Sequence, residues 1–197
     1  MGSNDGQFGF ATKVDRRYRV ILWGTGFVGK MVLRELISHP LFELVGVIAH
    51  DPAKAGVDVG ELVGVDPVGL AVSTDVEAVL AVEADAVAYF GPTAAHPKYN
   101  VEAAISSMRA GKHFVSTAMT PWVYPAACAP GEIDAVVAVC EETGRSCFTT
   151  GIDPGFANDL MPMTLMGLCG RVDTVRIQEI LDYSTYTGDY SPNPIGE

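Results

Sequence analysis

The sequence feature that most constrains this chain is a glycine-rich turn that follows a short apolar run. The run ends at Trp23, and three glycines in G-x-G-x-x-G spacing follow it. A spacing of apolar residues that is typical of a helix begins at Phe27, just before the third glycine. In dinucleotide-binding folds the first glycine permits the tight turn, the second lets a pyrophosphate approach the backbone, and the third lets the helix pack on the sheet. The phosphates lie on N–H groups at the helix N-terminus, where the dipole favours negative charge. We therefore predict cofactor binding by Gly24, Thr25, Gly26, Phe27, Val28 and Gly29; the alternative is a tight turn that binds nothing.

Apolar runs and helical periodicities alternate as far as residue 150. The predicted strands cover residues 19–23, 44–49, 86–90, 113–116 and 147–150, with a shorter one near 70–72, and the predicted helices cover 27–38, 76–82, 97–110 and 132–143. This alternation with short connections is typical of a parallel sheet with helices on both faces. The expected fold class is α/β, with a Rossmann-type doubly wound parallel sheet over residues 18–151. Residues 1–17 are polar and lack the apolar core of a signal peptide, so we expect a disordered tail.

Loops after the predicted strands should meet at one edge of the sheet, where ligands bind in such folds. The residues concerned are His50, Asp51, Gly91, Pro92, Thr93 and Thr117. An acid at the position of Asp51 binds ribose hydroxyls and favours NAD, whereas His50 and Lys54 are bases that could meet the 2′-phosphate of NADP. Asp51 also opens an ordinary D-P-A-K turn. The sequence therefore indicates NAD(P)H and leaves the choice between the two cofactors open.

From residue 152 the pattern changes. A turn-rich loop, GIDPGFAND, precedes a predicted helix over residues 160–168, and residues 172–181 alternate apolar and polar as a one-sided strand does. One strand cannot make a stable sheet. We expect residues 152–197 to begin a second domain that is incomplete here, either because the chain is a shortened form of a longer protein or because a partner supplies the missing strands.

Composition excludes several classes of partner. The net charge of -11 argues against nucleic acids and anionic membranes, and no apolar run approaches the roughly 20 residues that span a bilayer. The cysteines lack metal-binding spacing, so we expect no metal site and reduced, mostly buried thiols in a cytoplasmic protein. These cysteines are Cys128, Cys140, Cys147 and Cys169.

Four stretches together resemble one family. GTGFVG, DAVAYFGPT, RAGKHFVST and GIDPGFANDLMPMTL are similar to the dihydrodipicolinate reductase-like superfamily, nearest to 2,4-diaminopentanoate dehydrogenase and the native amine dehydrogenases. The resemblance covers roughly residues 19–186. It implies a Rossmann domain, a second domain for substrate binding and dimerisation, a homodimer, and hydride transfer between NAD(P)H and a small C=N, C–NH₂ or C=O compound. By matched position Gly91, Pro92 and Thr93 would lie near the nicotinamide ribose, and the loop after Thr117 would face the substrate.

The sequence also offers candidates for substrate binding and for catalysis. Trp122 and Tyr124 would suit an apolar substrate pocket, or would only pack on their own domain, and Asn158 is a further substrate candidate. The His-His…Lys stretch of true dihydrodipicolinate reductases is absent, and no carboxylate occurs from residue 117 to 131, where the amine dehydrogenases carry a glutamate. The catalytic residue is therefore unknown. Candidates by type are Glu102, Glu132, Asp153, Asp159, Tyr124 and His96, and for most of them a capping or solvated role is the simpler interpretation. The alternatives are dihydrodipicolinate reductase-type C=N reduction in lysine biosynthesis and a non-catalytic or truncated nucleotide-binding relative.

Overall fold

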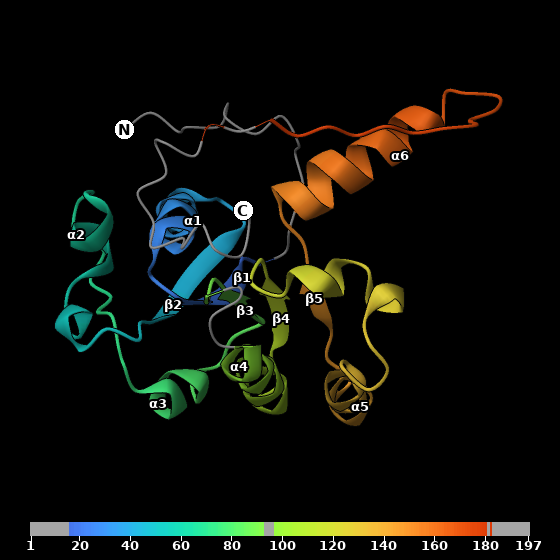
Figure 1. Ribbon diagram of the computed structural model, residues 1–197. Helices are drawn as coiled ribbons and strands as arrows, with labels where there is room; N and C mark the ends of the chain where they lie inside the picture. Colours follow the sequence, from blue (N-terminus) through green and yellow to red (C-terminus); the bar gives the residue numbers. More distant parts are fainter. Residues whose placement is uncertain (1–15, 93–96, 181, 183–197) are drawn as a thin grey trace.

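A five-stranded parallel sheet organises the protein. The computed structural model describes residues 16–92, 97–180 and 182. The strands stand in the order β2-β1-β3-β4-β5 (Figure 1). Their bounds are β1 (Tyr18–Trp23), β2 (Phe42–Ile48), β3 (Ala86–Tyr89), β4 (His113–Ser116) and β5 (Cys147–Thr149). Because β1 lies between β2 and β3, the strand order reverses there, and the loops after these strands form the ligand-binding edge of such a sheet. The expected fold class is confirmed.

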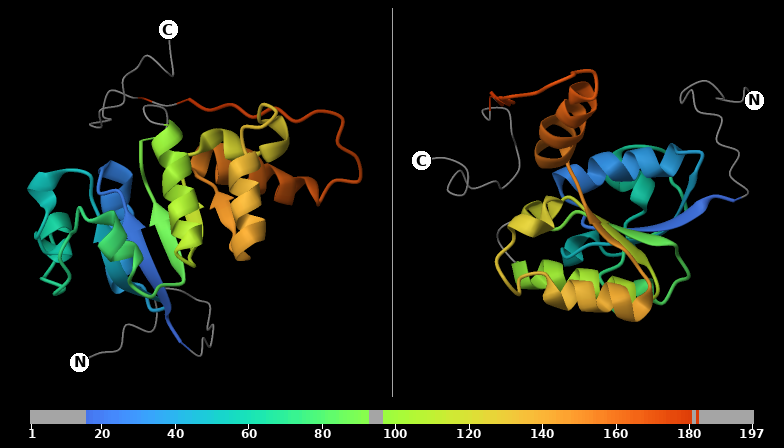
Figure 2. Two further views of the ribbon diagram at one scale, coloured as in Figure 1. Left: turned by 90° about the horizontal axis from the view of Figure 1, so that it is seen from below. Right: turned by 90° about the vertical axis from the view of Figure 1, so that its right-hand side faces the viewer.

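Helices cover both faces of the sheet, as the two further views make plain (Figure 2). On one face α1 (Phe27–Ser38) and α2 (Val59–Val63) pack against Val20 and Leu22 of β1. On the other face lie α3 (Val76–Leu80), α4 (Pro97–Arg109) and α5 (Asp134–Thr143), which pack around Ile21 and Trp23. Successive residues of β1 thus enter opposite cores, which explains why its sequence is apolar without alternation.

Short helical turns complete the connections at the carboxyl edge of the sheet. These are η1 (Pro52–Lys54), η2 (Thr120–Val123) and η3 (Pro125–Ala127). The segment η4 (Ile152–Leu160) winds as a wide helix with non-helical backbone at residues 153–155, and α6 (Met161–Met166) follows it. Figure 1 shows α6 (orange) projecting away from the sheet.

Two predicted strands are wrong. Around residue 71 the structure has only isolated bridges, from Asp58 to Ala71 and from Ile48 to Ser73. Residues 172–180 alternate as a strand would, yet they are exposed and form no strand, whereas residue 181 lies outside the described residues. A strand requires a neighbour for its backbone N–H and C=O groups. No described strand lies beside this segment, so the alternation alone does not produce one.

An ion pair fixes the start of β1. Arg16 donates to both carboxylate oxygens of Asp85 at 2.6 Å, and the backbone N–H of Arg19 donates to Asp85 at 2.7 Å. The Arg16 guanidinium, together with the Arg19 N–H, lowers the pKa of Asp85 to about 2. Arg16 falls within the tail that the sequence predicts, yet it is joined to the fold by these contacts; residues 1–15 lie outside the described part of the chain.

Candidate functional site

Two of the three motif glycines are required by the fold itself. Gly24 has φ +107°, and a Cβ there would lie 2.5 Å from the carbonyl oxygen of Phe90. A Cβ on Gly29 would overlap the carbonyl oxygen of Gly24. These contacts let β1, the loop after β3 and the start of α1 approach one another closely. The first and third glycines therefore have the turn and packing roles that the motif predicts.

Gly26 has a different reason to be glycine. Its backbone is extended (φ −75°, ψ −163°), a conformation open to any residue, and it is exposed. A Cβ built on it meets nothing within 4 Å. Gly26 occupies the N-cap position of α1, where it has no side chain to accept from the first-turn N–H groups, and no acidic residue lies in that turn. The fold thus leaves clear space before a helix N-terminus, which fits a pyrophosphate there.

The loop after β2 places a cation against this turn. Lys54 Nζ donates to the carbonyl oxygen and to the hydroxyl of Thr25, both at 3.2 Å. The Asp51 carboxylate accepts from the N–H of Ala53 at 2.9 Å and so caps η1, which is the ordinary turn role that the sequence left open. His50 is exposed, and its ring meets the Tyr99 ring edge-on at 6.3 Å. Of the two bases considered for a 2′-phosphate, Lys54 is the one that contacts the glycine-rich turn.

The loop after β3 lies against the same turn. The N–H of Phe90 donates to the carbonyl of Trp23 at 2.7 Å, which brings Gly91 and Pro92 beside the glycine motif. The Pro92 carbonyl accepts from the side chain of Asn100 at 2.7 Å. Thr93 and His96, both named from the sequence, lie outside the described residues.

The loops after β4 and β5 carry the substrate candidates. Thr117 is half-buried directly after β4. Trp122 is half-buried and packs on the core, whereas the side chain of Tyr124 is 68% exposed. The Asn158 amide donates to the carboxylate of Asp153 within η4, and η2 contacts η4. The structure thus brings Trp122 and Asn158 onto adjacent segments at the carboxyl edge of the sheet.

The carboxylates named from the sequence have structural partners or face solvent. Glu132 accepts from the N–H of Ala129 at 3.1 Å, and Glu102 is exposed on α4. Asp159 was expected to cap the following helix. Instead its carboxylate accepts from the N–H of Gly155 at 2.7 Å, because the wide turn of η4 folds back on itself.

The cysteines differ from their expected surroundings. The expectation of mostly buried thiols is wrong: three of the four are half-buried and Cys169 is exposed. Burial, and to a smaller extent Cys140, raises the pKa of Cys147 to about 12. A thiolate is the reactive form of cysteine, and burial disfavours it at Cys147. Within the described residues no cluster of histidine, cysteine and carboxylate groups is arranged to hold a metal ion.

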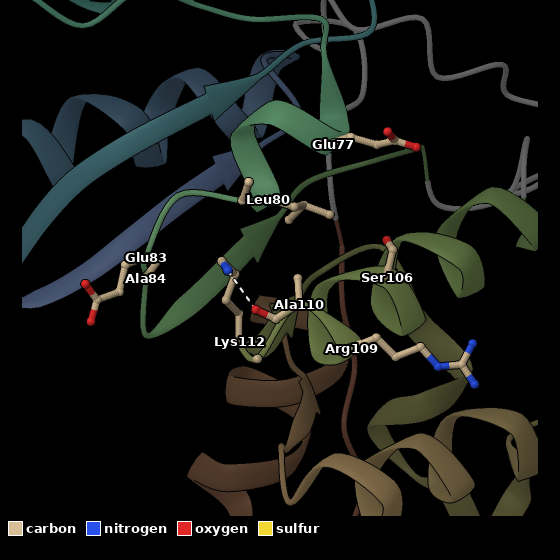
Figure 3. Close-up of a pocket in the computed structure, with 10 residues that line it drawn as sticks. Glu77, Leu80, Glu83, Ala84, Ser106, Arg109, Ala110 and Lys112 are labelled. Atoms are coloured by element: carbon tan, nitrogen blue, oxygen red, sulfur yellow. Dashed lines mark hydrogen bonds between the residues drawn. The ribbon is translucent and has the colours of Figure 1, made fainter.

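A hollow of about 680 Å³ lies elsewhere, near the start of β3 and the end of α4. Figure 3 shows Lys112 there with its amine turned to the carbonyl of Ala110, a hydrogen bond of 2.8 Å. Glu77 and Glu83 line the same hollow as Arg109 and Lys112. It belongs to the amino edge of the sheet, where Lys112 donates to the carbonyl of Ala110 directly after the end of α4. The predicted cofactor residues that the structure describes lie at the other edge.

The fold and the glycine-rich turn together define the class: a Rossmann-type dinucleotide-binding α/β protein. Residues 18–119 match the family model described as "Dihydrodipicolinate reductase, N-terminus". The chain therefore belongs to the dihydrodipicolinate reductase-like family, as the sequence motifs indicated.

Two amine dehydrogenases and a 3-ketoreductase are among the proteins similar to this chain. The chain is 42% identical over 168 residues to an amine dehydrogenase from Streptomyces virginiae, a match that covers 84% of this chain and 46% of that protein. The solved structure of an amine dehydrogenase from Mycobacterium smegmatis is similar with a TM-score of 0.68 and 25% identity, over 79% of this chain and 45% of the other. A 3-ketoreductase from Actinomadura kijaniata, solved with TDP-benzene and NADP, shares the fold with a TM-score of 0.54 and 21% identity, over 77% of this chain and 43% of the other. The chain thus spans slightly less than half the length of these proteins.

No described helix combines the length and the apolar character that crossing a lipid bilayer requires.

Proposed function

We propose that this protein is an NAD(P)H-dependent oxidoreductase that acts on a C=N, C–NH₂ or C=O bond of a small molecule, in the manner of an amine dehydrogenase. The observation that carries the cofactor assignment is the open space at Gly26, because nothing in the described fold itself requires glycine at that position. The similarity to the amine dehydrogenase from Streptomyces virginiae supports the amine chemistry. Proteins of this fold solved in complex with NADP or with NAD support a nicotinamide cofactor.

The described residues supply the cofactor half of the site in this proposal. The turn from Gly24 to Gly29 would hold the pyrophosphate, with the N-terminus of α1 facing its charge. Lys54 lies beside this turn and would pair with the 2′-phosphate of NADPH, so we propose that NADPH is accepted. The loop of Gly91 and Pro92, continued by Thr93, would lie along the nicotinamide ribose.

The substrate half of the site lies beyond β4 and β5. Thr117, Trp122, Tyr124 and Asn158 would surround the reacting carbon, with Trp122 as the part of this wall that is fixed to the core. The bound nicotinamide supplies or accepts the hydride. Amination also requires a base for ammonium and a negative group beside the iminium ion. Residues 117–131 hold no carboxylate, so the proposal assigns binding roles and no catalytic acid. A homodimer in the cytoplasm belongs to the same proposal.

An activity assay tests the proposal and separates its alternatives. NADPH or NADH is incubated with the protein, a panel of small ketones and ammonium at alkaline pH, and cofactor oxidation is followed. Oxidation that requires both ketone and ammonium is the expected result. Oxidation without ammonium would indicate ketone reduction, and rescue of a lysine auxotroph would indicate dihydrodipicolinate reductase-type chemistry, which the family match keeps as the second candidate. Cofactor binding without any turnover would indicate a nucleotide-binding relative that does not catalyse.

A further inference from the structure

A buried polar pair joins strand β3 to helix α4 directly behind the loop at Gly91. The Tyr89 hydroxyl donates to Asn100 Oδ1 at 2.6 Å, and Asn100 Nδ2 donates to the Pro92 carbonyl at 2.7 Å. Tyr89 is 0% exposed and Asn100 is 1% exposed. Buried polar groups are costly unless they are paired, so this arrangement is maintained by its own hydrogen bonds.

The chemistry of the groups fixes the direction of these hydrogen bonds. A proline carbonyl can only accept, so the Asn100 amide must present its NH₂ group to Pro92 and its oxygen to Tyr89. The Tyr89 hydroxyl must then be the donor. Burial, with a smaller contribution from Tyr99, raises the pKa of Tyr89 far above its ordinary value, so this hydroxyl keeps its proton.

The absence of a side chain at Gly91 leaves room for the Tyr89 side chain. A Cβ on Gly91 would overlap the phenol end of Tyr89, with Cε1 only 2.6 Å away. Gly91 therefore lets the Tyr89 hydroxyl pass the loop and reach Asn100. The hydrogen bonds continue from the strand through the helix to the backbone of the loop at Pro92.

The same side chains also contact the glycine-rich turn. The Trp23 ring, which immediately precedes Gly24, meets Tyr89 edge-on at 5.5 Å and Tyr99 edge-on at 6.1 Å. The first turns of α4 thus contact the end of β1 through Tyr99 and the loop after β3 through Asn100. Displacement of Asn100 would move the Pro92 loop relative to the turn that binds the other end of the cofactor.

We propose that Tyr89 and Asn100 are positioning residues that hold the Pro92 carbonyl, and with it the backbone of Gly91 and Pro92, against the nicotinamide half of the bound cofactor. This inference rests on the proposed function. The hydrogen bonds of the pair lead to Pro92 and not to the Gly24–Gly29 turn that would hold the pyrophosphate, and the pair meets the residue before that turn through the Trp23 ring. Its loss should therefore affect binding of the two halves of the cofactor unequally.

The test uses the whole chain and two ligands. Dissociation constants are measured for NADPH and for 2′-phospho-ADP-ribose, which lacks the nicotinamide. The variants are Tyr89→Phe, which removes one hydroxyl, and Asn100→Leu, which removes both hydrogen bonds at similar volume. Ser107→Ala is the matched control, because Ser107 is also fully buried on α4 but donates only to the Ala103 carbonyl of its own helix. Circular dichroism and thermal unfolding establish that each variant is folded.

The expected result is a loss of about tenfold in NADPH affinity for Tyr89→Phe and Asn100→Leu, with 2′-phospho-ADP-ribose bound within about twofold of wild type. Ser107→Ala should bind both ligands as wild type does. Equal losses for the two ligands would show a general structural role and would overturn the inference, as would variants that bind NADPH unchanged. A folded wild-type chain that binds neither ligand would overturn the proposed function itself, which the other outcomes leave standing.

Discussion

The ammonium group of Lys54 lies 3.2 Å from both the carbonyl oxygen and the hydroxyl of Thr25, so the loop after β2 contacts the glycine-rich turn through a positive charge. Thr25 is itself buried between the motif glycines. Both oxygens that Lys54 contacts are uncharged, so the ammonium ion retains its attraction for an anion. A phosphate at this point would form the stronger, charge-assisted hydrogen bond.

Lys54→Met is expected to weaken NADPH binding by about tenfold, because a hydrogen bond between two charged groups contributes about 1.5–3 kcal/mol and solvent exposure reduces it. NADH lacks the 2′-phosphate, so its affinity should change by less than about twofold. Fluorescence titrations with both cofactors measure the difference, and Arg109→Ala, at the far edge of the sheet, is the control variant. Equal losses for NADH and NADPH would contradict a contact to the 2′-phosphate.

Asp51→Asn separates the two roles considered for this residue. Asparagine keeps an oxygen that can accept from the Ala53 N–H, so the cap on η1 and the melting temperature should both persist. If the carboxylate also accepts from ribose hydroxyls, NADH affinity should fall by about threefold to tenfold, since a charged acceptor is replaced by a neutral one. NADH affinity equal to that of wild type would leave Asp51 with the turn role alone.

Gly29→Ala is expected to destabilise the fold by about 2–3 kcal/mol, because its methyl group would overlap the Gly24 carbonyl in a closely packed turn. Gly26→Ala is the matched control, since its methyl group would point into open space. Urea denaturation of the three proteins gives the free energies of unfolding. If the two variants proved equally stable, the assignment of a packing role to the third glycine would be wrong.

Asp85→Asn should lower stability in a pH-dependent way. The pKa of Asp85 in the folded protein is about 2, below its ordinary value of 3.8. A lowered folded pKa contributes stability that is fully present above pH ~4 and is lost as the pH falls towards ~2. We expect the variant to be about 1 kcal/mol less stable at neutral pH, a modest value because Arg16 is largely exposed. Urea titrations over this range should show the gap closing as the pH falls; a constant gap would mean that the Arg16 ion pair does not stabilise the fold.

Much of the fold could be predicted because it is determined locally. The helix Phe27–Ser38 has the bounds that its periodicity predicts, and His113–Ser116 has those of its apolar run. The glycine motif also predicts close packing at Gly24 and Gly29, which the geometry confirms, and ligand access at Gly26, which stays a prediction. Such features depend on residues that are neighbours in sequence or that directly follow a strand.

Other features could not be predicted because they depend on distant partners. Residues 172–180 have the pattern of a strand but no described strand beside them, and the pairing of Asp159 with Gly155 follows from the unusual winding of η4. The hydrogen bond between Tyr89 and Asn100 requires β3 and α4 to be packed together. The sequence does contain an indication of this hydrogen bond, because Asn100 lies on the same buried helix face as Ala103, Ala104 and Ser107. A polar side chain on a buried face requires a hydrogen-bond partner.

The measurement that tests the account most directly is a fluorescence titration of the wild-type chain and of Gly26→Val with NADPH and NADH. Valine at this position has open space around its Cβ and an extended backbone that suits it, so the variant should fold with an unchanged melting temperature. Its side chain would occupy the space before the N-terminus of α1, so cofactor binding should be lost. A Gly26→Val protein that binds either cofactor as tightly as wild type, or a folded wild-type chain that binds neither, would contradict the assignment of this turn as the cofactor site.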